Sequence, residues 1–186
     1  MKTKTTKGKI DDLSWRIENK TLTISGNGDI PAYSYSSNGT TAPWGSEFTD
    51  VTIKDGIESI SDSAFYGCKK LINVSIPKSV KFIGEKAFQC CDNLKSVNLE
   101  NSSIKTIGKL AFADCRNLKS IIFPETIKTI GRGAFHGCWH LRKITIPKTI
   151  ETIEEYAFLD CGCLTKIANG EIVFQSITAS LPNNEV

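Results

Sequence analysis

The sequence has no long hydrophobic run, and its longest apolar runs are of the kind Ile121–Phe123. A membrane-spanning helix needs about 20 such residues, so none is expected. The apolar segment of a secretory signal is also missing, because Lys2, Lys4, Lys7 and Lys9 are followed by no such stretch. Two interpretations follow: the protein stays in the cytoplasm, or this is a mature or trimmed chain that has lost its leader.

The chain also lacks a strong charge bias and the motifs of an active site. Its 186 residues, enough for about one domain, carry 23 basic and 20 acidic side chains with a pI near 8.4. This balance falls short of that of dedicated nucleic-acid binders. We find no nucleophile elbow, phosphate-binding loop or histidine–carboxylate pair. We therefore expect a globular protein that is not an enzyme and needs no cofactor, with nucleic acid a disfavoured partner.

What the sequence does contain is an internal repeat. The dipeptide Ala-Phe recurs at steps of 23 or 24 residues, followed three residues later by cysteine and six residues later by leucine. The members of these columns are Phe65, Phe88, Phe112, Phe135 and Phe158; Cys68, Cys91, Cys115, Cys138 and Cys161; and Leu71, Leu94, Leu118, Leu141 and Leu164. A fixed period of this length is typical of a solenoid, in which stacked turns share one apolar interior.

Each leucine opens a segment in which apolar residues alternate, as in Leu71-x-x-Val74-x-Ile76. Apolar residues at every second position predict a strand with one buried face. Pro77, Pro124 and Pro147 mark where the backbone pairing of each strand stops, because proline has no N–H to donate. We expect a parallel ladder of about six strands, at 48–53, 71–76, 94–99, 118–123, 141–146 and 164–169.

The rest of each repeat is expected to bring the chain back to the next strand. A second apolar pair such as Val80 and Ile83 is followed by a glycine at Gly84, Gly108 or Gly131, where we expect a turn. Ala-Phe-x-x-Cys then predicts a short helical turn. The connection between the strand segment and the second apolar pair is one residue longer in one repeat, at Glu100–Ser103. We interpret the extra residue as an insertion tolerated at a turn; the alternative is a local distortion beside a binding patch.

The two ends of a solenoid need atypical covers. Alternation over residues 13–25 predicts a β-hairpin, and Trp44 is expected to plug the first turn. Downstream, Asn169-Gly170 predicts a turn into the segment 172–174. The expected organisation is a flexible N-terminus (1–12), a capping hairpin and linker (13–47), the repeat array (48–169) and a C-terminal cap and tail (170–186).

The pattern Cys-x-x-Leu-x-x-Val-x-Ile-Pro-x-x-Val-x-x-Ile-Gly-x-x-Ala-Phe resembles the BspA-like, or Treponema pallidum-type, leucine-rich repeat. The segment from Trp15 to Gly56 looks like the cap that leads such arrays. The resemblance implies an α/β-type, right-handed leucine-rich-repeat solenoid. It also implies, for some members, a secreted or surface location and adhesion to host proteins. The alternative is an intracellular protein–protein interaction scaffold, which the missing leader and unpaired thiols favour.

The histidines and cysteines offer one metal-like constellation, His136, Cys138 and His140. Because Cys138 is already explained by its buried column and no fourth ligand is evident, we expect no metal site. The column cysteines stack at about 5 Å, within disulfide range. Their side chains should all point inward, so they are expected to stay reduced.

The exposed side of the ladder is the candidate binding surface. Positions between the inward-pointing residues carry no acidic side chain in the five repeats that begin at Leu71, and five of these positions are basic. The candidates are Lys95, Asn98, Lys119, Ile122, Arg142, Lys143 and Lys166. Their positive charge predicts an acidic protein or glycan partner. The alternative is that these residues only keep the sheet soluble.

Overall fold

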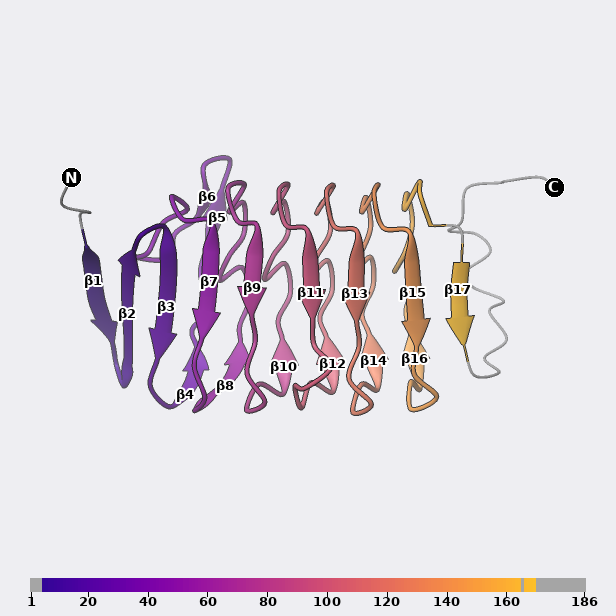
Figure 1. The fold of residues 1–186 in the computed structure, drawn as a ribbon, viewed down its shortest axis with the longest axis horizontal. Helices are drawn as coiled ribbons and strands as arrows, with labels where there is room; N and C mark the ends of the chain where they lie inside the picture. The colour runs from indigo at the N-terminus through magenta and orange to yellow at the C-terminus, as the bar shows by residue number, and fades with distance from the viewer. Residues whose placement is uncertain (1–4, 165, 170–186) are drawn as a thin grey trace.

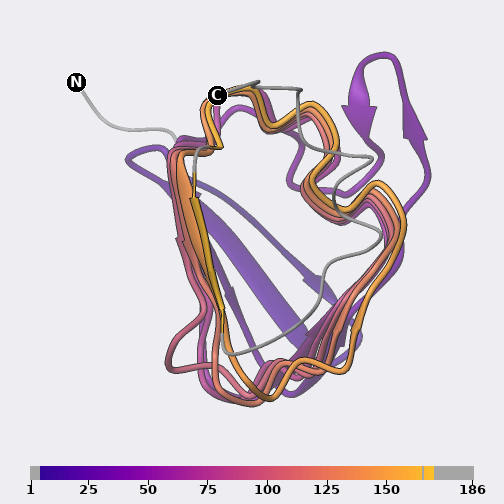
Figure 2. The same cartoon turned by 90° about the vertical axis from the view of Figure 1, so that its right-hand side faces the viewer.

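The computed structural model describes residues 5–164 and 166–169. The chain winds into a solenoid whose coils follow one another along a single axis (Figure 1). Viewed down that axis the coils superimpose, and each has three sides (Figure 2). Two sides are β-sheets and the third is a row of tight turns. The solenoid and the parallel strands expected from the repeat are confirmed.

The first side, sheet A, contains all six strands that the repeat predicts, each somewhat shorter than expected. Its nine strands, in spatial order, are β1 (Thr6–Ile10), β2 (Leu13–Glu18), β3 (Thr21–Ser25), β7 (Asp50–Ile53), β9 (Asn73–Ser75), β11 (Ser96–Asn98), β13 (Ser120–Ile122), β15 (Lys143–Ile146) and β17 (Lys166–Asn169). From β3 onward every neighbouring pair is parallel. Val51, Val74, Val97 and Ile121 share one register, which holds the apolar column inside.

The apolar pair of each repeat forms a second parallel sheet, sheet B, which is extended at one end by a strand from the segment expected as a linker. Its six strands are β4 (Gly28–Ile30), β8 (Ile57–Ile60), β10 (Phe82–Ile83), β12 (Thr106–Ile107), β14 (Thr129–Ile130) and β16 (Thr152–Ile153). The sequence predicted that these pairs are buried but not that they form a sheet. A strand of two residues is too short to show the alternation of apolar and polar residues that identifies a strand in a sequence. Its pairing is therefore apparent only in the stacked coils of the structure.

The third side contradicts the expected helical turns: no helix occurs among residues 5–164 and 166–169. Alternate backbone N–H groups bond across to the next coil, as Phe65 N does to Ala87 O at 2.8 Å, while Cys68 N bonds back to Phe65 O at 3.2 Å. Ser63 and Gly67, on either side of Ala64-Phe65, have φ of 56° and 66°. These left-handed residues and the sideways hydrogen bonds break any helix, because a helix needs every N–H for its own carbonyls.

The interior is a stack of identical rings. Successive phenylalanines from Phe65 to Phe158 lie 5.0, 5.1, 5.4 and 5.4 Å apart, with planes within 11° of parallel. Trp44 continues the stack at 5.7 Å from Phe65, and its indole N–H donates to Ala64 O. The structure thus places Trp44 over the first ring, as the sequence predicted.

The N-terminal end is more ordered than expected. The hairpin over residues 13–25 is present as β2 and β3, and β3 continues sheet A by pairing with β7. Residues 6–10, assigned to a flexible terminus, instead form β1 along the free edge of β2. A Cβ on Gly8 would lie 2.7 Å from the Trp15 ring, so glycine leaves room for that indole. The Lys-Gly-Lys pattern shows no apolar alternation, which explains why this strand was missed.

Two further features concern the links. In the insertion, the Ser102 hydroxyl donates to Leu99 O at 2.7 Å, and Ile107 still pairs in register with Ile83 and Ile130. The extra residue is therefore absorbed within one turn. A short hairpin, β5 (Tyr35–Ser36) with β6 (Gly39–Thr40), projects beside the tight turns (Figure 2). The turn expected at Asn169-Gly170 and the segment 172–174 lie outside the described residues.

Candidate functional site

A row of three basic residues crosses the outer side of sheet A, just before the strands begin. Lys95, Lys119 and Arg142 occupy equivalent positions in successive coils. Lys119 N donates to Lys95 O at 2.9 Å, and Arg142 N donates to Lys119 O at 3.3 Å. All three side chains are exposed. We call these three residues the basic row.

The remaining candidates lie in the strands themselves. Asn98 and Ile122 are paired neighbours in β11 and β13, both exposed, and Ile122 is 48% exposed. In the backbone register, Ser120 pairs with Lys143 and Lys143 pairs with Lys166. The structure therefore brings the predicted positions together on four adjacent strands, from β11 to β17.

No acidic side chain in the described part of the chain neutralises the basic row. Within the described residues, none of its members has a carboxylate within 4 Å. Beside sheet B, by contrast, Lys81 pairs with Glu58 at 2.7 Å and Lys128 pairs with Glu151 at 2.7 Å. Each of those ion pairs joins residues one repeat apart. Like charges one repeat apart, as in the basic row, instead repel one another, by about 1 kcal/mol for two unit charges about 4 Å apart in water.

The first strand of the array, which precedes the five repeats that begin at Leu71, carries an acidic residue. Asp50 in β7 accepts hydrogen bonds from Thr49 Oγ1 at 2.6 Å and Asn73 Nδ2 at 2.8 Å. These hydrogen bonds lower the pKa of Asp50, so its charge is retained. The outer side of sheet A is thus acidic at β7 and basic from β11 onward.

The three residues of the metal-like constellation point in different directions. The Cys138 thiol is buried and donates to Phe112 O at 3.2 Å. The His140 ring, on the outside, lies with Nδ1 2.8 Å from Arg116 O, whereas His136 Nδ1 lies 3.9 Å from Asp160. No group of three or more potential metal-binding side chains is found within the residues that the structure covers.

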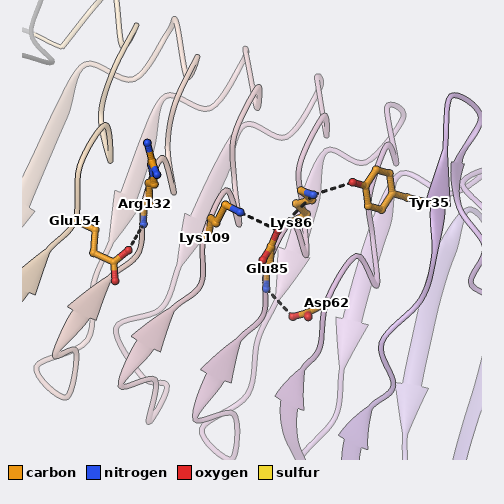
Figure 3. Close-up of polar contacts among 7 residues, drawn as sticks. All are labelled: Tyr35, Asp62, Glu85, Lys86, Lys109, Arg132 and Glu154. Atoms are coloured by element: carbon orange, nitrogen blue, oxygen red, sulfur yellow. Dashed lines mark hydrogen bonds and ion pairs between the residues drawn. The ribbon is translucent and has the colours of Figure 1, made fainter.

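A polar cluster beside the β5–β6 hairpin was not predicted (Figure 3). Lys86 Nζ donates to the Tyr35 hydroxyl at 2.7 Å and also lies 4.7 Å from the Tyr35 ring centroid. The hydrogen bond to Tyr35 is the main reason that the pKa of Lys86 is raised. Glu85 is bridged by Lys86 and Lys109, at 3.3 and 3.5 Å. Tyr66 stacks on Tyr35 at 4.4 Å, so the cluster anchors the hairpin to the coils.

Hollows flank this hairpin on two sides. One, of about 310 Å³, is lined by residues that include Asn38, Tyr66 and Lys69, and the other, of about 640 Å³, by residues that include Tyr33, Asp62 and Lys86. Both are open to solvent, and neither contains a nucleophile held by a general base.

Comparisons with known proteins agree with this architecture. The solenoid is similar to a leucine-rich repeat protein from Eubacterium ventriosum (22% identity, TM-score 0.69), covering 90% of this chain but 44% of that one. It is also similar to the Treponema pallidum leucine-rich repeat protein (26%, 0.63), covering 87% and 71%. A third similar structure is a leucine rich cell surface protein from Faecalibacterium prausnitzii (23%, 0.52), covering 88% and 54%.

The chain thus spans less than half the length of the Eubacterium protein. A search of the curated proteins finds no match. None of the described segments forms a helix that could cross a membrane. The model of the BspA type leucine rich repeat region matches in six copies over residues 41–165. The chain therefore belongs to the BspA-type leucine-rich repeat family.

Proposed function

We propose that the protein is a non-enzymatic binding module that uses the outer side of sheet A to bind an acidic protein or glycan. The observation that carries this proposal is the basic row. Its three cations are exposed, lie in successive coils and have no acidic neighbour among the described residues. A partner carboxylate or sulfate would relieve their mutual repulsion and gain direct ion pairs, and the same field would speed its approach.

We further propose that the module acts on the bacterial surface or after secretion, in adhesion to an acidic host component. This is supported by the similar fold of a protein described as a leucine rich cell surface protein. An intracellular scaffold is the second candidate, favoured by Cys163, an exposed free thiol of a kind typical of reducing compartments. The genomic sequence upstream of Met1 separates the two, because an encoded signal peptide favours adhesion.

The binding proposal is tested with a double charge reversal, Lys119→Glu with Arg142→Glu. Both side chains are exposed, so we expect the fold and the melting temperature to stay as they are. Binding to immobilised poly-L-glutamate or polygalacturonate, measured by interferometry, should weaken by at least about tenfold. Added salt should reduce the difference between the variant and the wild type.

The matched control is Lys78→Glu with Lys105→Glu, which changes the net charge equally at two exposed lysines outside the basic row. Like the basic row, neither has a carboxylate within 4 Å among the described residues. This control should lose little affinity. If instead the Lys119/Arg142 variant binds as well as the wild type, the binding site lies on another side or at the end caps.

A further inference from the structure

One aromatic side chain lies unusually open to solvent at the edge of the proposed surface. Trp139 is 60% exposed, whereas Trp15 and Trp44 are 8% and 4% exposed. The equivalent positions of the other coils are Lys69, Asp92, Arg116 and Gly162. The indole therefore fills no repeated structural role, and nothing in the interior requires it.

The backbone holds Trp139 at a corner that leads directly into sheet A. Leu141 N donates to Cys138 O at 3.0 Å, which closes a tight turn with Trp139 and His140 at its centre. Arg142 follows immediately after Leu141. The distance from Trp139 to Arg142 is at most about 11 Å along the chain, and the turn shortens it.

The preceding coil supplies two more cations at the same corner. His140 N donates to Arg116 O at 3.2 Å, and Arg142 N donates to Lys119 O at 3.3 Å. Arg116 is therefore the neighbour of the Trp139 corner, as Lys119 is the neighbour of Arg142. His140 Nδ1 also lies 2.8 Å from Arg116 O, which fixes the imidazole against that coil. Three exposed cations thus lie on the same two coils as the exposed indole, at or next to this corner.

We propose that this corner binds an anionic polysaccharide, with Trp139 stacked on the face of a sugar ring and Arg116, Lys119 and Arg142 paired with its carboxylate or sulfate groups. The inference rests on the proposed function and assigns its partner class. An indole offers a flat apolar face with a polar edge, which suits the C–H face of a sugar ring. The guanidinium groups of Arg116 and Arg142 can pair with carboxylate or sulfate in a bidentate manner.

Three observations favour a polysaccharide over an acidic peptide or a nucleic acid. Neighbouring parallel strands are about 4.8 Å apart, close to the length of one sugar ring, so a polyuronate extended along the axis can present one carboxylate to each coil. The strands beside the corner present short hydroxyl and amide side chains, Ser96, Asn98 and Ser120, all exposed and suited to sugar hydroxyls. The net charge of +3 is low for a nucleic-acid binder.

Tryptophan fluorescence with polygalacturonate as the probe tests the assignment. Since Trp15 and Trp44 are buried, a change in acrylamide quenching reports mainly on Trp139. We expect polygalacturonate to protect the emission from quenching and neutral dextran to leave it unchanged. Trp139→Ala should weaken polygalacturonate binding about fivefold, and Trp139→Phe should restore part of the loss. Phe82→Ala, an exposed aromatic in sheet B, is the matched control and should bind like the wild type.

The outcomes separate this inference from the proposed function. Unchanged polygalacturonate affinity in Trp139→Ala, or no polygalacturonate binding at all, would overturn the polysaccharide assignment. If poly-L-glutamate or single-stranded DNA binds the wild type as tightly as polygalacturonate, the assignment also fails, while dependence on Lys119 and Arg142 would preserve the proposed function. If no acidic probe depends on Lys119 and Arg142, the proposed function itself fails.

Discussion

The Cys91 thiol donates a hydrogen bond to the carbonyl oxygen of Phe65, one coil earlier, over 3.2 Å. The same oxygen accepts the backbone N–H of Cys68, also at 3.2 Å. This contact recurs from Cys115, Cys138 and Cys161 to the corresponding phenylalanine carbonyls. The repeat therefore uses cysteine as a small apolar residue that can still satisfy a buried acceptor.

The first prediction concerns thiol reactivity. Burial raises the pKa of Cys68 and Cys161 to about 12, and raises the pKa of Cys91 and Cys138 well above the usual range. Because the thiolate is the reactive form, the column should react with Ellman's reagent only after unfolding in urea. The exposed Cys163 should react at once, and Cys163→Ser should remove this fast phase. Fast labelling of column cysteines in the folded protein, located by mass spectrometry, would contradict their burial.

The second prediction is a loss of stability at alkaline pH. The folded state keeps Cys68 and Cys161 protonated up to about pH 12, whereas the thiols of the unfolded chain lose their protons near pH 9. Since the folded state then binds more protons, the free energy of unfolding falls as the pH rises through this range. Each thiol contributes up to about 1.4 kcal/mol per pH unit. Urea melts should show a shallower fall for Cys161→Ser than for the wild type; parallel slopes would argue against this linkage.

The third prediction concerns the ring stack. Phe112 is fully buried and stacks on Phe88 and Phe135 at 5.1 and 5.4 Å. Phe112→Ala should lower the free energy of unfolding by about 3–5 kcal/mol, because it leaves a cavity in the middle of the stack. Phe82→Ala, at a residue that is 39% exposed in sheet B, should cost less than about 1 kcal/mol. Equal losses for the two variants in urea melts would show that the stack is not the main source of stability.

The fourth prediction concerns the glycines that follow sheet B. A Cβ on Gly108 would lie 2.7 Å from the carbonyl carbon of Gly84 and 2.9 Å from the backbone N of Glu85. Neither backbone atom can move without separating the coils, so Gly108→Ala should cost about 1–3 kcal/mol. Gly162→Ala is the matched control, since among the residues that the structure describes its Cβ would meet only Trp139 O, at 3.9 Å. A Gly108→Ala protein as stable as this control would mean that the coils separate easily.

Features that lie within one repeat could be predicted from the sequence, whereas features that depend on the stacking of coils could not. The strands of sheet A could be predicted because Leu-x-x-Val-x-Ile places apolar residues at alternate positions, which is the pattern of a strand with one buried face. The sequence predicts only turns at Gly84, Gly108 and Gly131. In the structure these glycines also allow the backbones of neighbouring coils to approach closely. Close approach between coils is a property of the stack, and it leaves no signal within one repeat.

The left-handed residues on the third side illustrate the same limit. Lys86 and Leu110 have φ of 56° and 55°, although neither residue type suggests such a backbone. Their conformation is imposed by hydrogen bonds to the next coil, since Lys86 N donates to Lys109 O and Leu110 N to Arg132 O, both at 2.9 Å. Local propensity favoured a helical turn, and contacts between coils overrode it.

The candidate site could be located from the sequence, but its electrostatics could be only partly predicted. Equivalent positions in successive repeats placed Lys95, Lys119 and Arg142 in line. The same rule, applied to opposite charges one repeat apart, would also have predicted the ion pair of Lys81 with Glu58. Trp139 could not be predicted from the strand pattern, because it lies at a corner between coils. The sequence signal there is one aromatic residue at a position that is charged or glycine in the other repeats.

The direction of the backbone hydrogen bonds determines how the molecule responds to force. In both sheets and in the row of tight turns, these bonds join one coil to the next, so they run along the axis of the solenoid. Tension between the two ends pulls directly on one set of bonds at a time, and the coils peel away in sequence. Each released coil of about 23 residues can extend to about 80 Å. Under load, the protein therefore lengthens in steps and dissipates work.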